Sequence, residues 1–242
     1  MRRGIFVTGT DTGVGKTLVS TALVLWARSR GARVGGMKPA ESGCARVDGR
    51  LVPADAELLR RAAGGEDDLD RVCPHRLEAP LAPGIAAELE GVDISLDRAR
   101  RALDALSASH PDGVIVEGAG GLLVPMDPAF HTVADWAEAL GLPVLVVARA
   151  GLGTINHTAL TLEALAAREI PCRGVVLVAK SAEEEAAARR NAEAIRRLAG
   201  AEILAVIPPL AARDEWERAR LAARILEEAF AGRKLDPASL LA

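Results

Sequence analysis

The stretch Ile5-Phe-Val-Thr-Gly-Thr-Asp-Thr-Gly-Val-Gly-Lys-Thr17 decides the fold of this chain. Its apolar start predicts a buried strand over residues 5–8, and the residues after it predict a helix over 17–30 that ends at Gly31. The glycines between them let the backbone approach a phosphate, and the first N–H groups of the helix attract an anion. Lys16 and Thr17 complete a phosphate-binding loop, in which lysine reaches the β and γ phosphates and threonine binds Mg²⁺. The loop is one residue longer than the usual spacing GxxxxGK[ST], so we interpret it as a variant.

Five more short apolar runs alternate with helix-like segments along the rest of the chain. Most are continuously apolar, which is typical of strands buried on both faces. The pattern predicts strands over 33–37, 113–116, 143–148, 174–178 and 203–207, and helices over 95–107 and 182–199. It indicates an α/β fold, a single-domain parallel sheet with helices on both faces, similar to a P-loop NTPase, with ligands at the carboxyl ends of the strands. Residues 39–49 and 71–91 contain turn formers and prolines, so we predict two long loops that shape the binding site.

Composition limits the classes of partner. The 242 residues are 50% hydrophobic and 26% charged, and no Pro/Ser/Gly-rich linker divides them, so we predict one domain over residues 1–242. A net charge of −3, spread as mixed arginine and glutamate, favours neither nucleic acid nor an anionic membrane as a partner. No apolar run approaches the roughly 20 residues of a membrane span, and the N-terminus lacks the apolar region of a signal peptide, so we expect a cytoplasmic protein. Three widely spaced cysteines fit reduced thiols.

Three charged residues outside the loop are candidates for the site. Glu117 follows the apolar run 113–116 at the predicted carboxyl end of the strand, where a carboxylate can bind Mg²⁺; the alternative is a surface carboxylate in a turn. Asp55 is a second candidate, although its spacing does not distinguish it from an exposed loop residue. Lys38 follows the second predicted strand and is one of only four lysines. Its compact charge suits a phosphoryl or carbamate oxygen, and a solvated lysine is the alternative.

Four motifs stand in register along the chain: the phosphate-binding loop, Lys38-Pro-x-x-Ser42-Gly, Glu117-Gly-Ala-Gly-Gly and Leu152-Gly-Thr-Ile-Asn156-His. With them, the sequence closely resembles the dethiobiotin synthetases from Ile5 to about Leu210. The resemblance implies an ATP-dependent ring closure that turns 7,8-diaminopelargonate, CO₂ and ATP into dethiobiotin, ADP and phosphate, through a carbamate and a carbamic-phosphoric anhydride. It also implies Mg²⁺ and a homodimer with the active site at the interface.

The resemblance assigns roles position by position. Lys16 and Lys38 would be catalytic, Ser42 would bind the diamine, and Thr17, Asp55 and Glu117 would surround the metal. In the family, a helix start contributed by the other subunit binds the substrate carboxylate, and here it matches Gly153, Thr154 and Asn156. Without the resemblance, Asn156-His157 would be interpreted as a helix cap and a surface histidine. The implied nucleotide-binding residues are Thr12, Gly13, Val14, Gly15, Lys16, Thr17, Leu18, Asp55, Glu117, Lys180, Ser181, Pro208, Pro209 and Leu210.

Two departures and one rival remain open. Lys180 stands where many relatives have an asparagine that contacts adenine, and lysine offers no acceptor, which leaves the preferred nucleotide open. Gly84 stands where a histidine is common. The rival is a partitioning or site-selection switch ATPase, whose loop carries an extra lysine near its start, where this chain has Asp11.

Overall fold

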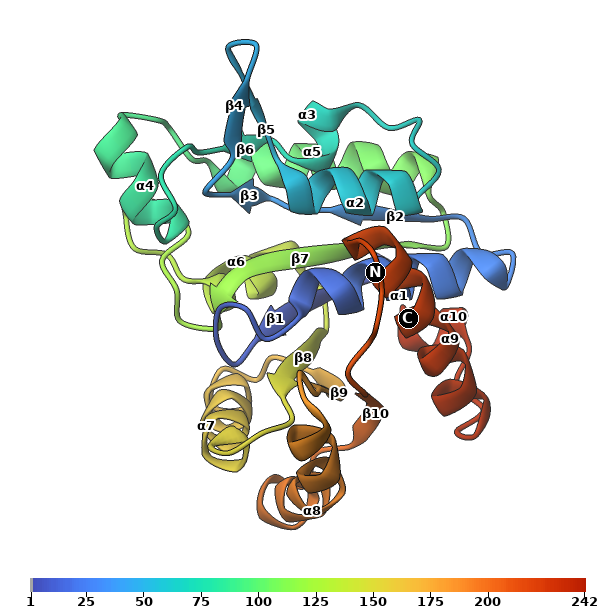
Figure 1. The fold of residues 1–242 in the computed structure, drawn as a ribbon. Coiled ribbons are helices and arrows are strands. Elements are labelled where there is room, and N and C mark those ends of the chain that lie inside the picture. The colour runs from blue at the N-terminus through green and yellow to red at the C-terminus, as the bar shows by residue number, and fades with distance from the viewer. Residues whose placement is uncertain (1) are drawn as a thin grey trace.

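The computed structural model describes residues 2–242. Its centre is a six-stranded sheet in which all neighbours are parallel, with the order β10-β9-β8-β1-β7-β2 (Figure 1). The six predicted strands are confirmed as β1 (Gly4–Gly9), β2 (Val34–Met37), β7 (Gly113–Gly121), β8 (Val144–Arg149), β9 (Cys172–Val178) and β10 (Ile203–Ile207).

Successive strand residues face opposite sides of this sheet, and both sides are covered by helices. On β1, Ile5 and Val7 pack into one core while Phe6 packs into the other. The first core includes α1 (Lys16–Ser29), α9 (Glu215–Ala231) and α10 (Pro237–Leu240). The second includes α5 (Leu96–Ser109), α6 (Val133–Leu140), α7 (Thr154–Ala167) and α8 (Ala182–Ala199). Burial on both faces explains why the strands read as continuous apolar runs.

The two segments predicted as long loops contain short elements, so that prediction is wrong in part. The first holds β3 (Ala40–Glu41) and β4 (Ala45–Val47), and β4 forms a hairpin with β5 (Arg50–Val52), which leads into α2 (Ala54–Ala62). The second holds the end of α3 (Leu69–Val72), β6 (His75–Arg76) and α4 (Pro83–Glu90). Pro83 was interpreted as a loop residue, but it lies in the first turn of α4, where proline is favoured because the missing N–H has no helical partner.

Strand β7 is longer than predicted, which changes the position of Glu117. The prediction ended the strand before Glu117, but β7 pairs with β1 as far as Gly121, opposite Gly9. The glycines after Glu117 do not form a turn there. Gly118 continues the strand, and a Cβ at that position would lie 2.8 Å from the ring of Phe6. Glu117 therefore lies inside a strand, just beyond the point where Met37 ends the neighbouring β2 opposite Val116.

The structure also bears on two expectations from composition. Within residues 2–242, no helix combines the length and apolar character that a membrane crossing requires. The three cysteines are free thiols, with Cys44 and Cys73 buried and Cys172 exposed.

Candidate active site

A cavity of about 660 Å³ opens at the carboxyl ends of β1, β2 and β7. The chain leaves β1 between β7 on one side and β8 on the other, and ligands of parallel sheets bind where strand order reverses in this way. The phosphate-binding loop forms one wall, and the segments after β2 and α3 form the other. Its lining includes Thr12, Gly13, Gly15, Lys16, Thr17, Leu18, Lys38, Glu41, Ser42, Asp55, Pro80, Pro83, Glu117, Lys180, Glu215 and Arg218.

The phosphate-binding loop depends on glycines in left-handed conformations. Gly13 and Gly15 have φ of 71° and 105°, and a Cβ on Gly15 would lie 3.2 Å from Val178. Gly15 precedes α1, and no side chain caps that helix, so its first N–H groups are available to an anion. The Nζ atom of Lys16 donates to the carbonyl oxygen of Asp11 at 3.0 Å, which folds the lysine over the loop.

Among residues 2–242, no carboxylate lies in hydrogen-bond or ion-pair contact with Lys16. Burial, together with the positive charge of Lys38, lowers the pKa of Lys16 to about 8. A bound phosphate would favour the charged form. Lys16 is therefore electrostatically suited to an anion that comes from outside the chain.

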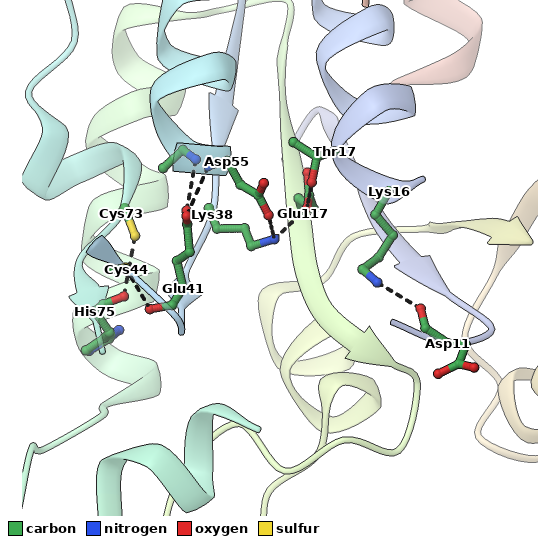
Figure 2. A network of polar contacts seen from close by, with 11 residues as sticks. Asp11, Lys16, Thr17, Lys38, Glu41, Cys44, Asp55, Cys73, His75 and Glu117 are labelled. Carbon is green, nitrogen blue, oxygen red and sulfur yellow. Dashed lines mark hydrogen bonds and ion pairs between the residues drawn. The ribbon is translucent and has the colours of Figure 1, made fainter. Parts of the chain in front are cut away.

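Lys38 lies in a second arrangement, which we name the carboxylate cluster: Thr17, Lys38, Asp55 and Glu117 (Figure 2). The register of β2 and β7 places Lys38 beside Glu117, and Nζ of Lys38 contacts Oε1 of Glu117 at 2.5 Å and Oδ2 of Asp55 at 2.9 Å. Glu117 is fully buried, and the side chain of Lys38 is only 6% exposed. The alternatives of a solvated lysine and a surface carboxylate are therefore wrong.

The charges of the carboxylate cluster stabilise one another. Burial lowers the pKa of Lys38, but the charges of Glu117 and Asp55 and the hydrogen bonds to both outweigh it and raise that pKa above its ordinary value. Burial raises the pKa of Asp55, yet the charge of Lys38 and the hydrogen bond from Lys38 hold that pKa below its usual range. Lys38 is thus a fixed positive charge beside the phosphate-binding loop, and it cannot serve as a base near neutral pH.

The oxygen atoms of the carboxylate cluster fit Mg²⁺. Thr17 donates its hydroxyl to Oε1 of Glu117 at 2.9 Å, while Oε2 of Glu117 is buried without a hydrogen-bond partner. Hydroxyl and carboxylate oxygens are ligands that Mg²⁺ prefers. Residues 2–242 contain no group of three or more His, Cys, Asp or Glu side chains that could hold a metal alone. Phosphate and water oxygens would therefore complete the coordination, as is usual for Mg²⁺ bound with a nucleotide.

The wall opposite the phosphate-binding loop includes Ser42, Pro80 and Pro83. Behind it, Gly84 donates its backbone N–H to the carbonyl oxygen of Pro125 at 3.0 Å. A Cβ on Gly84 would lie 2.4 Å from the backbone oxygen of Asp127, so the neighbouring backbone occupies the space of any side chain. The glycine that departs from the family pattern is therefore required by this packing.

The structure separates several predicted residues from the cavity. Val14 is buried beneath the loop, and Ser181 caps α8 by accepting from the N–H of Glu184 at 3.2 Å. Neither they nor Pro208, Pro209 and Leu210 line the cavity.

The predicted carboxylate-binding residues also lie elsewhere. Gly153, Thr154 and Asn156 form the start of α7 and do not line the cavity of their own chain. Gly153 is the N-cap residue and no side chain caps α7, so the interpretation of Asn156 as a helix cap is wrong.

Sequence reasoning missed Glu41, Glu215 and Arg218. Glu41 was quoted only as a spacer in the Lys38 motif, although the proline before α2 signals that this helix needs a cap from elsewhere. Glu215 and Arg218 lie at the start of α9, shortly after the predicted residues Pro208, Pro209 and Leu210, but no local pattern distinguishes them from surface helix residues.

The fold and the site together define a nucleotide-binding protein of the P-loop class. A family described as an AAA domain matches residues 3–215. The chain is 56% identical to the ATP-dependent dethiobiotin synthetase BioD of Anaeromyxobacter dehalogenans (strain 2CP-C), over 85% of this chain and 90% of the relative. It is 40% identical to the enzyme of the same name from Thermodesulfovibrio yellowstonii, over 87% and 90%. The chain belongs to the ATP-dependent dethiobiotin synthetase family.

Solved structures of more distant proteins share the fold alone. The MinD cell division protein of Aquifex aeolicus has a TM-score of 0.58 at 16% identity, covering 96% of this chain and 97% of that one. A ParA family ATPase from Chlorobium tepidum has a TM-score of 0.52 at 12% identity, covering 100% and 97%. The likeness of these two proteins to this chain extends to the architecture only.

Proposed function

We propose that this chain is an ATP-dependent cyclo-ligase that makes dethiobiotin from 7,8-diaminopelargonate, CO₂ and ATP. The observation that carries the proposal is Lys38, a fixed positive charge held by Asp55 and Glu117 beside a phosphate-binding loop. Membership of the synthetase family supports the choice of substrates. We also propose that residues 1–242 act as one synthetase domain, and that its use of ATP places it in the cytoplasm.

In the proposed reaction, one amine of the diamine adds to CO₂ and loses a proton to form a carbamate. A carbamate oxygen attacks the γ phosphorus, the bond to the bridging oxygen breaks, and ADP leaves. The second amine then attacks the carbamoyl carbon and loses a proton, phosphate leaves, and the ureido ring closes. Phosphoryl transfer of this kind requires alignment and charge stabilisation more than a covalent nucleophile.

The two lysines divide this work. Lys16 and the free N–H groups of α1 would bind the β and γ phosphates. Lys38 would neutralise charge on the carbamate and on the transferred phosphoryl group, where a preorganised cation stabilises the transition state. Thr17, Asp55 and Glu117 would hold Mg²⁺, which when bound neutralises phosphate charge.

Ser42 would bind the diamine on the far side of Lys38 from the phosphate-binding loop. The carboxylate of the diamine would lie against Gly153, Thr154 and Asn156 of a second copy of the chain, because an uncapped helix start attracts a carboxylate. A homodimer is supported by exposed apolar side chains at this helix: Leu152, just before α7, is 97% exposed, and Leu160 of α7 lines one groove with Leu123, which follows β7.

The nucleoside would extend away from the carboxylate cluster, past Gly15 and Leu18 toward Lys180. ATP is the nucleotide we propose. Ser181, Pro208, Pro209 and Leu210 remain predictions for the surroundings of the base, and so does Val14 for the loop.

Phosphate release from ATP, CTP and GTP with Mg²⁺ and bicarbonate, with and without 7,8-diaminopelargonate, tests the proposal. We expect release to require the diamine and to be fastest with ATP, with dethiobiotin detected by mass spectrometry. Release that is indifferent to the diamine would favour a switch ATPase instead.

A further inference from the structure

The first turn of α2 is capped by a residue from another strand. Its own N-cap residue, Pro53, makes no side-chain hydrogen bond. Glu41, at the end of β3, instead accepts hydrogen bonds from the N–H of Asp55 (to Oε1, 3.0 Å) and of Ala56 (to Oε2, 2.9 Å) (Figure 2). The first N–H groups of a helix need such acceptors. Glu41 therefore fixes where α2 begins.

Glu41 is an unfavourable choice if helix stability is its only role. Glu41 is only 6% exposed, so its carboxylate is largely removed from water. Burying a carboxylate in this way costs more free energy than burying a neutral polar group with the same two hydrogen bonds. Serine or asparagine at position 53 would cap α2 locally with a neutral side chain. This cost indicates a role in the site.

The amide that Glu41 binds belongs to Asp55. The side chain of Asp55 reaches Nζ of Lys38 at 2.9 Å, so a single residue has its backbone held by Glu41 and its carboxylate in the carboxylate cluster. Glu41 itself does not contact Thr17 or Glu117 through any hydrogen bond. The hydrogen bond that links Glu41 to the cluster is the one to the backbone of Asp55.

We propose that Glu41 is a positioning residue, which holds the Asp55 carboxylate at the Mg²⁺–nucleotide site by binding the backbone amide of Asp55. The inference rests on the proposed function only for the identity of the site's ligands. Partners that orient metal ligands typically change metal affinity about 10- to 100-fold when they are removed.

Mg²⁺-dependent binding of a non-hydrolysable ATP analogue tests this proposal without the diamine. In the full-length Glu41→Gln variant, we expect the Mg²⁺ concentration for half-maximal analogue binding to rise about tenfold. Binding of the analogue in EDTA should remain within about twofold, because the N–H groups of α1 and Lys16 are untouched.

Glu90 supplies the matched control. Its carboxylate also accepts from two consecutive backbone N–H groups, those of Glu78 (3.2 Å) and Ala79 (2.7 Å), but these lie away from the carboxylate cluster. Glu90→Gln should leave the Mg²⁺ dependence unchanged. Should Glu41→Gln fail to fold, as judged by calorimetry, Glu41→Asp keeps the charge, shortens the reach and is expected to shift the Mg²⁺ dependence in the same direction.

A double-mutant cycle decides whether the effect passes through Asp55. In an Asp55→Ala background, Glu41→Gln should produce no further change in Mg²⁺ dependence, since coupled residues are not additive. The same fold-change in both backgrounds would overturn the proposal, as would an unchanged Mg²⁺ dependence in the Glu41→Gln protein. A raised KM for the diamine with normal Mg²⁺ dependence would also overturn it and would make Glu41 a substrate contact. Failure of the proposed function would appear separately, as phosphate release that ignores the diamine.

Discussion

Lys16 and Lys38 line one cavity but differ in what balances their charge. Lys16 donates to a backbone carbonyl, and its pKa is lowered to about 8 by burial and by Lys38. Lys38 contacts two carboxylates, which raise its pKa above the ordinary value despite burial. The positive charge in the phosphate-binding loop is thus available to an incoming anion, whereas the positive charge of Lys38 is already neutralised by the carboxylates of its cluster. The comparison teaches that two lysines of one cavity can be held in opposite electrostatic environments.

Removing the charge of Lys16, which no carboxylate neutralises, should have the largest effect on activity. We expect Lys16→Ala to lower kcat/KM by at least about a thousandfold, because a cation that contacts the transferred phosphates is lost. Diamine-dependent phosphate release measures this effect. Lys234→Ala, which removes an exposed lysine beyond α9, is the control and should be normal. Near-normal activity of Lys16→Ala would refute the role of the loop.

Removing the charge of Lys38, which two carboxylates neutralise, should reduce both turnover and the stability of the fold. Lys38→Met leaves the buried Glu117 without a cation, and breaking a buried pair from one side costs about 3 kcal/mol or more. We expect a fall of this size in the free energy of unfolding, measured by urea denaturation, together with loss of phosphate release. Lys16→Met should lose activity without this loss of stability. An equal loss of stability in both variants would break the contrast between the two lysines.

The pH dependence of nucleotide binding should separate the lysines further. A folded-state pKa near 8 means that Lys16 loses its proton above pH 8 in the free protein, while the bound phosphate favours the charged form. The affinity for an ATP analogue in EDTA should therefore fall as pH rises above 8, by at most about tenfold per pH unit. Lys16→Arg stays charged and should show a flatter profile. An equally steep profile in that variant would assign the titration to another group.

The smallest effect is expected at the far side of the carboxylate cluster. Ser42→Ala should raise the KM for the diamine about fivefold, which corresponds to one hydrogen bond of about 1 kcal/mol. The affinity for the ATP analogue should not change. Calorimetric titration of the analogue together with steady-state kinetics would check both. If the substitution changed only the affinity for the nucleotide, Ser42 would be a nucleotide contact and its assignment to the diamine would be wrong.

Features written in contiguous residues could be predicted from the sequence. The phosphate-binding loop is a local motif, and the six buried strands follow from continuous apolar runs. Glu117 was predicted at the end of its strand and does line the cavity, but β7 continues past it. The glycines after it were interpreted as a turn, whereas Gly118 continues the strand and packs closely against Phe6.

Features that depend on distant segments could not be predicted in this way. Asp55 resembles any loop aspartate until α2 brings it to Lys38, and the cap that Glu41 gives α2 joins segments 14 residues apart. Gly84 needs the backbone of Asp127, which no local pattern connects to it. The family resemblance supplied the role of Asp55 and gave no hint of Glu41.

The central strands end at different heights, so the cavity above them is elongated from the end of β2 to the end of β1. β2 ends opposite Val116, and β1 continues three residues past the same point, from Phe6 to Gly9, so the two strand ends are roughly 10 Å apart along β1. Two ligands can therefore lie end to end along one strand, the nucleotide phosphates near the end of β1 and the acceptor near the end of β2. A sheet with level strand ends would offer a single shallow rim. The offset between the ends of β1 and β2 therefore sets the direction in which a group would pass from donor to acceptor.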